Sequence, residues 1–184
     1  SIIATNNAHM CKLNADFRNK PTPTNILSFS DGSIDQIGDE FHLGDIFLGY
    51  EIINKEAKKQ NIPLKNHLNH LIVHGVLHLL GYEHEDEVQA KIMENKEKKI
   101  LGIFNIPNPY SLWGKKTMTF LKNFKMGPFS FRKQSVRDEL SELIENSNKT
   151  NDSFDDHESA LWRKILDLKD LTAESLMAVS DTHL

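Results

Sequence analysis

Hydrophobic positions in the first 110 residues form short strand-like runs and longer stripes with helical spacing. The strand-like runs cover residues 1–5, 26–29 and part of 41–50. Stripes with apolar residues three or four positions apart predict helices over residues 8–16, 51–60, 64–80 and 85–102. Residues 32–38 are polar and contain glycine, which predicts a loop. Because helices and strands alternate without a regular βαβ rhythm, the pattern predicts an α+β fold.

The texture of the chain changes after residue 110. Residues 111–137 carry seven basic and no acidic side chains, so we expect 111–135 to be a basic linker. Helices are predicted over residues 136–146 and 155–168, with a polar connection between them. Their apolar faces offer too little core for an independent domain. We therefore expect a first domain over residues 1–110 and a helical tail over residues 136–184.

The composition excludes several classes of protein. The 184 residues carry a net charge of −4, and 39% are hydrophobic, which suits one globular domain. The single cysteine, Cys11, rules out an internal disulfide and favours a reducing compartment such as the cytoplasm. The apolar run 71–73 is interrupted by His74, so no membrane span is expected. The start at Ser1 lacks signal-peptide features and suggests a processed or truncated N-terminus.

Histidines are concentrated in one short segment. Five of the nine lie between residues 67 and 84. His74 and His78 are four positions apart, so their rings leave one face of a helix about one turn apart. Gly81 can take the left-handed conformation that ends a helix and turns the chain back, which brings His84 beside the other two. Three imidazoles with an open fourth position are typical of a catalytic zinc site, so we predict one Zn²⁺.

The same spacing occurs in a class of zinc peptidases, in which a glutamate follows the first histidine and acts as general base. Here that position is Gly75, so a peptidase would lack its base. A structural rather than catalytic metal would need a fourth ligand from the protein to close the site. Both alternatives remain open at this point.

Four ordered motifs resemble the YbeY endoribonuclease family. The segment HGVLHLLGYEH at 74–84 closely resembles the family signature. Three further segments resemble family elements, namely LNADFR at 13–18, PTNILSF at 23–29 and LGDI at 43–46. The resemblance implies a YbeY-like metalloprotein fold, a small mixed sheet packed with helices, followed here by a helical C-terminal appendage. Because the family normally has a further strand and helix before this segment, the fold is expected to be N-terminally truncated.

The resemblance also implies an activity. It implies a single-strand-specific, metal-dependent endoribonuclease in 16S rRNA 3′-end maturation and ribosome quality control, with ribosomal RNA and the small ribosomal subunit as partners. It carries over His74, His78 and His84 as zinc ligands and Arg18 as the cation of the active-site cleft. A guanidinium can hold a phosphate bidentately while metal-activated water attacks phosphorus. Glu83 stands where the family usually has aspartate and could orient a ligand.

Some features keep more than one interpretation. His67 and His70 could line an RNA path, support the metal ligands or simply be exposed polar residues. Zinc-dependent proteolysis and a non-catalytic ribosome-assembly factor with a structural metal remain the rival functions. Residues 136–184 resemble the N-terminal part of TlyC/CorC hemolysin-like proteins without their CBS domains, which suggests a fusion or read-through product.

Overall fold

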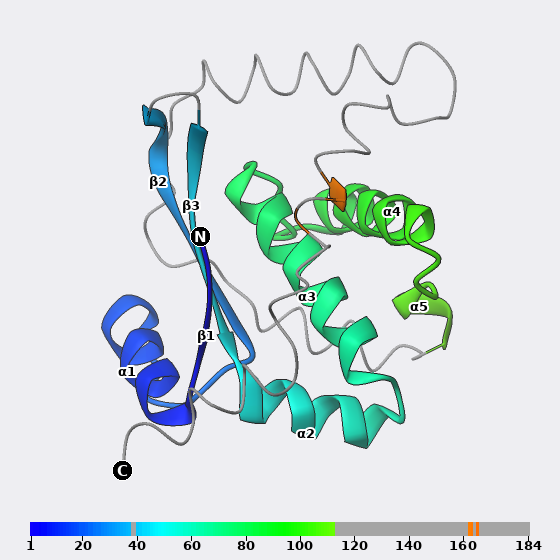
Figure 1. The fold of residues 1–184 in the computed structure, drawn as a ribbon, viewed down its shortest axis with the longest axis horizontal. Coiled ribbons are helices and arrows are strands. Elements are labelled where there is room, and N and C mark those ends of the chain that lie inside the picture. The colour runs from blue at the N-terminus through cyan, green and yellow to red at the C-terminus, as the bar shows by residue number, and fades with distance from the viewer. Residues whose placement is uncertain (38–39, 113–161, 164, 166–184) are drawn as a thin grey trace.

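A computed structural model describes residues 1–37, 40–112, 162, 163 and 165. It contains a three-stranded mixed sheet with helices on both faces (Figure 1). The strands, in the order β1-β3-β2, are β1 (Ile2–Thr5), β3 (Glu40–Gly49) and β2 (Ile26–Ile37). β1 runs parallel to β3, and β2 runs antiparallel to it. The predicted α+β class is therefore confirmed.

The first four helices lie close to their predicted positions, whereas the short fifth was not predicted. They are α1 (Asn7–Arg18), α2 (Tyr50–Gln60), α3 (Leu64–Leu79), α4 (Glu87–Ile103) and the short α5 (Pro109–Leu112). Side-chain caps set two of the starts, because Asn6 accepts a hydrogen bond from the His9 amide and Asp86 accepts one from the Gln89 amide. Beyond α3, Gly81 has a φ of 86°, the left-handed conformation that the sequence predicted.

The hairpin between β2 and β3 corrects one prediction. Residues 32–38 were expected to form a polar loop, but β2 continues to Ile37 and pairs with the start of β3. Register partners there include Asp35 with His42 and Ile37 with Glu40, after an irregularity between Ser30 and Asp35. This pairing is made by backbone groups, which a pattern of side chains does not report.

The two faces of the sheet carry different helices. Phe29 and Phe47 face α1, since the Phe29 ring contacts Phe17 and the Phe47 ring contacts His9. On the other face, Ile26 and Ile46 contact α3, in keeping with the alternation of side chains along a strand. Figure 1 shows α1 and α3 on opposite sides of the strands.

The long helix α3 forms the centre of the hydrophobic core. It packs against β2, β3, α2 and α4, and its residues from 67 to 78 are buried without interruption. A helix enclosed in this way must be apolar on every face except where polar side chains find partners. The buried histidines of α3 are therefore held at defined positions rather than exposed to solvent.

One residue of the predicted tail belongs to this core. Residues 162, 163 and 165 are helical, as expected, and Trp162 is only 4% exposed within the core cluster. Ile165 is partly buried and packs against the same cluster. The first two residues of the predicted linker 111–135 belong to α5. The rest of that linker, the helix 136–146 and the other residues of the segments that resemble TlyC/CorC proteins lie outside the described residues.

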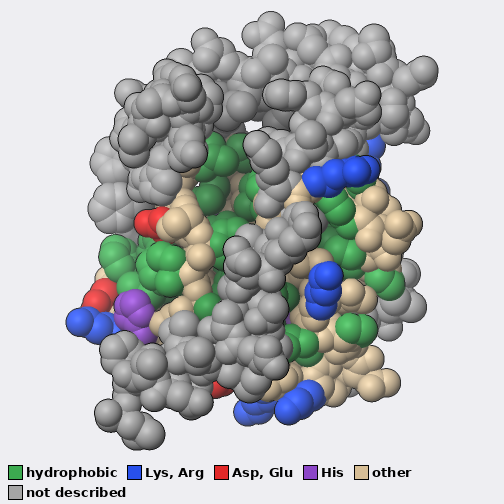
Figure 2. Space-filling view, viewed as in Figure 1, with side chains coloured by type: hydrophobic (Ala, Val, Ile, Leu, Met, Phe, Trp, Pro, Cys, Tyr) green, Lys and Arg blue, Asp and Glu red, His purple; other side chains and the backbone are tan. Residues whose placement is uncertain are grey.

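Among the described residues, no helix is long and apolar enough to cross a membrane. Figure 2 shows one face of the molecule, on which the described lysine and arginine side chains are scattered and do not gather in one patch, with hydrophobic side chains between them.

Candidate metal centre

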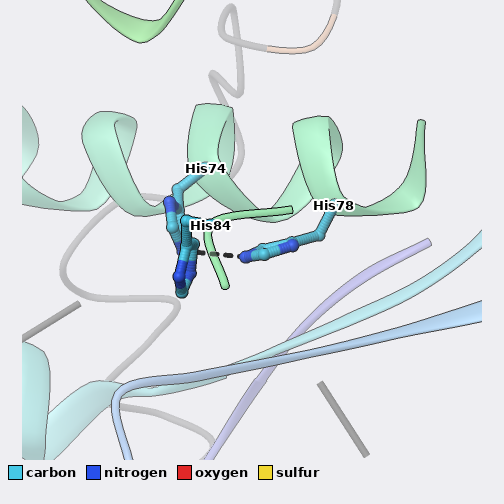
Figure 3. Close-up of side chains that lie close together, drawn as sticks. All are labelled: His74, His78 and His84. Carbon is cyan, nitrogen blue, oxygen red and sulfur yellow. Dashed lines mark hydrogen bonds between the residues drawn. The ribbon is translucent and has the colours of Figure 1, made fainter. Parts of the chain in front are cut away.

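Three histidines meet at the C-terminal end of α3. His74 and His78 extend from neighbouring turns of α3, and the loop after Gly81 brings His84 back against them (Figure 3). The ring centroids of His74 lie 4.6 Å from His78 and 5.4 Å from His84, and those of His78 and His84 lie 5.0 Å apart. One ligand atom from each ring lies within 4.8 Å of the others. The predicted clustering of these three residues is thus observed.

The spacing of the ring nitrogens fits a first-row metal ion. The Nε2 atoms of His74 and His78 face each other at 3.1 Å. Two nitrogens bound to zinc at about 2.0–2.1 Å in tetrahedral geometry lie roughly 3.3 Å apart. The cluster found among the described residues has three members, which would leave a fourth coordination position open. Such a set could hold a metal and still admit water or substrate.

The protonation of the cluster also suits a cation. Burial, together with repulsion from the neighbouring His74 and His84, lowers the pKa of His78 to about 2. Burial and His74 likewise lower the pKa of His84. These imidazoles therefore stay neutral near physiological pH, and neutral imidazole is the form that binds metals.

Glu83 lies beside the cluster from the loop after α3. Its Oε2 is 3.7 Å from Nδ1 of His78, the nitrogen turned away from His74. A carboxylate in that place can orient the ring of His78, as the sequence suggested.

A second carboxylate, Glu97, reaches the cluster from α4 and was not predicted. Its Oε1 accepts a hydrogen bond from Nδ1 of His74 at 2.8 Å, and its Oε2 accepts one from Nε2 of His70 at 3.0 Å. The hydroxyl of Tyr110 also donates to Oε2. Burial raises the pKa of Glu97, but the hydrogen bonds from His70 and His74 outweigh it and hold the pKa well below its usual range.

The sequence did carry a signal for Glu97. Along α4 the buried positions are Met93, Glu97, Ile100 and Leu101, so a charged residue occupies the apolar stripe. A carboxylate at such a position is almost never buried without a partner. This conflict between charge and pattern points to a buried polar contact, although it does not say with which residues.

The expectation that His67 and His70 are simply exposed is wrong. Each is only 1% exposed, because α2 and α4 cover the corresponding faces of α3. His70 contacts Glu97, which also holds the predicted ligand His74, so it belongs to the surroundings of the cluster. His67 instead pairs through Nε2 with Glu56 of α2 at 2.9 Å.

Arg18 lies 56 positions before His74 in the chain. It is the last residue of α1, the helix on the opposite face of the sheet from α3. Burial lowers the pKa of its guanidinium. Its role as the cation of the cleft stays a prediction.

Gly75 occupies the place where a zinc peptidase carries its glutamate. A Cβ on this residue would lie 2.8 Å from Cδ1 of Ile26 and 2.9 Å from Oγ of Ser28. Real Cβ atoms essentially never approach so closely, so a larger residue would force the side chains of Ile26 and Ser28 to move. The position therefore lacks the peptidase base and is crowded by the sheet.

The family model and the curated relatives that match this chain all name the same family. The family model described as "Endoribonuclease YbeY" matches residues 1–105. A protein named endoribonuclease YbeY from Chelativorans sp. is 47% identical over 112 residues, which cover 60% of this chain and 69% of the relative. The protein of that name from Rhodopseudomonas palustris is 42% identical over 113 residues, which cover 60% of each chain. The one from Francisella tularensis subsp. novicida is 44% identical over 108 residues, which cover 56% of this chain and 66% of the relative. The chain thus spans about two thirds of the length of these relatives.

Proposed function

This chain belongs to the YbeY endoribonuclease family, and on that premise we propose that it is a zinc-dependent endoribonuclease that hydrolyses single-stranded RNA. The observation that carries the proposal is the cluster of His74, His78 and His84, whose ligand atoms lie within 4.8 Å of one another. Three imidazoles with an open fourth position are typical of a catalytic rather than a closed structural zinc site.

The roles of the residues follow from their places. His74, His78 and His84 would hold the ion, and Glu83 and Glu97 would orient His78 and His74 through their outer nitrogens. When bound, zinc lowers the pKa of coordinated water toward neutrality and polarises a phosphoryl oxygen. Arg18 would bind a substrate phosphate bidentately and stabilise charge that develops on it.

The rival functions have less support. A peptidase of the corresponding class needs a general base at position 75, where this chain has a glycine packed closely against Ile26 and Ser28. A structural metal would call for a fourth protein ligand, whereas the cluster among the described residues has three. We therefore propose hydrolysis of RNA rather than either rival function.

The substrate in the cell is a further part of the proposal. We propose that the chain acts in the cytoplasm on ribosomal RNA, in maturation of the 16S rRNA 3′ end and in quality control of ribosomes, and that it contacts the small ribosomal subunit. A precursor RNA that carries the 16S 3′ end should then be cleaved faster than an RNA of the same length and shuffled sequence.

The first test is cleavage of a labelled single-stranded RNA by the purified, zinc-loaded chain. We expect cleavage by the parent, its loss in His78→Ala and no change in His9→Ala, which alters an exposed histidine of α1. The same RNA annealed to its complement should be resistant. A folded, zinc-loaded parent that leaves the single strand intact, or a His78→Ala variant that cleaves normally, would overturn the proposal.

A further inference from the structure

Glu97 joins three elements of the fold at the metal centre. From α4 it accepts hydrogen bonds from two histidines of α3 and from the hydroxyl of Tyr110 at the start of α5. Its side chain is only 1% exposed, so each of these contacts is shielded from water. Buried hydrogen bonds to a charged acceptor are among the stronger ones in proteins and fix the geometry of their donors.

The donor pattern fixes the tautomer of His74. An ionised carboxylate can only accept hydrogen bonds, so Nδ1 of His74, at 2.8 Å from Oε1 of Glu97, must carry a proton. In the neutral imidazole the lone pair is then on Nε2. That nitrogen lies 3.1 Å from Nε2 of His78, inside the cluster.

We propose that Glu97 is a positioning residue of the metal centre, which holds the His74 ring in place and keeps its Nε2 unprotonated and turned toward the ion. The inference rests on the proposed function in that it assigns a role at the same site. Glu97 does not touch the ligand position itself, because His74 lies between them.

The negative charge of the buried Glu97 carboxylate also favours a role beside a bound cation. A buried carboxylate is costly unless a cation or several donors compensate it. Among the described residues, the ion pairs of Glu97 are both with histidines, His70 and His74, which are charged only when protonated. A divalent cation bound at Nε2 of His74 would add positive charge on the far side of the same ring and make its N–H a stronger donor to Glu97.

Tyr110 and His70 hold the carboxylate from its other side. Burial and the nearby Glu97 raise the pKa of Tyr110, so its hydroxyl keeps its proton and remains a donor. The Tyr110 ring also meets the His70 ring edge to face, with centroids 5.7 Å apart. Glu97 is thus fixed on both oxygens, which is the condition for it to direct the His74 ring.

The test is the zinc affinity of the full chain, measured by competition with a chromophoric chelator. We expect Glu97→Gln to raise the Kd for zinc about 10- to 100-fold, the usual effect of losing a carboxylate that supports a metal-bound histidine. The matched control is Glu94→Gln, one turn earlier on α4, whose carboxylate instead pairs with Lys98 at 3.7 Å. This control should stay within about twofold of the parent. Equal affinity of Glu97→Gln and the parent would overturn the proposal.

A second measurement needs no variant and guards against a Glu97→Gln protein that fails to fold. In the metal-free parent, long-range ¹⁵N–¹H NMR correlations report which nitrogen of each histidine carries the proton. We expect the proton of His74 on Nδ1, and a proton on Nε2 alone would overturn the inference. Both readouts are independent of RNA, so a parent that binds zinc but cleaves no RNA would refute the proposed function and leave the role of Glu97 standing.

Discussion

Gly75 of α3 lies directly against Ile26 of β2, so that a Cβ on the glycine would stand 2.8 Å from Cδ1 of the isoleucine. The helix can approach the sheet this closely only because residue 75 has no side chain. The contact also fixes the depth of α3 beside the strands and thereby the positions of His74 and His78, its neighbours on the helix. The glycine inside the histidine motif therefore has a packing role.

Replacing Gly75 by alanine should destabilise the protein. The added methyl group meets Ile26, Ser28 and Ile46 at 2.8–3.1 Å, and overpacking of this kind costs about 1–3 kcal/mol. Gly102 of α4 is the matched control, since a Cβ there would meet nothing within 4 Å. Gly102→Ala should stabilise the protein by up to about 1 kcal/mol through its helix propensity. Urea unfolding followed by circular dichroism compares the two, and equal effects would contradict the packing argument.

The metal-free protein should lose stability in mild acid. In the folded protein the pKa of His78 is about 2, whereas a free histidine has a pKa of 6.5. The charged or titratable groups that surround His78 are His74, His84, Glu83 and Glu97. Between these values the unfolded state binds more protons. The free energy of unfolding therefore decreases as the pH is lowered, by about 1.4 kcal/mol for each unit below 6.5.

Urea titrations of the metal-free parent and of His78→Asn at about pH 7.5 and about pH 5.5 test this expectation. The parent should lose about 1 kcal/mol more than the variant between the two conditions. Glu97, whose lowered pKa contributes stability above the usual glutamate range and loses it only in stronger acid, does not interfere in this window. Parallel losses in both proteins would contradict the assignment to His78.

Zinc should stabilise the fold, because a ligand that binds only the folded state shifts the unfolding equilibrium. At a free concentration about 100 times its Kd, the gain is about 2.7 kcal/mol. His84→Ala removes one of the three proposed ligands and should abolish most of this gain, whereas His9→Ala should keep it. Thermal melts with zinc and with a chelator provide the measurement. A gain that persists in His84→Ala would place the ion elsewhere.

The sequence predicted the histidine cluster because its information is local. His74 and His78 are one helical turn apart, and Gly81 adopts the left-handed conformation that returns His84 to them. All three positions lie within eleven residues, so no knowledge of the tertiary fold was needed. The class of fold followed in the same way from the spacing of apolar positions.

The contacts of Glu97 could not be predicted in this way. Glu97 is 23 residues from His74 and 13 from Tyr110, and only the packing of α4 against α3 brings them together. The extension of β2 to Ile37 was missed for a related reason, since backbone pairing across a hairpin leaves little trace in side-chain pattern. Arg18 illustrates the reverse case, in which a motif named a residue whose role the fold alone does not assign.

Trp162 is far along the chain from the other residues of the core cluster and is buried among them. Its side chain is 4% exposed and belongs to the core cluster, so Trp162→Ala should reduce the free energy of unfolding by about 3 kcal/mol. The neighbouring Arg163 is exposed in the same helical segment, and Arg163→Ala should change stability by less than about 0.5 kcal/mol. Urea unfolding followed by circular dichroism measures both. If Trp162→Ala is as stable as the parent, the burial of Trp162 does not stabilise the core.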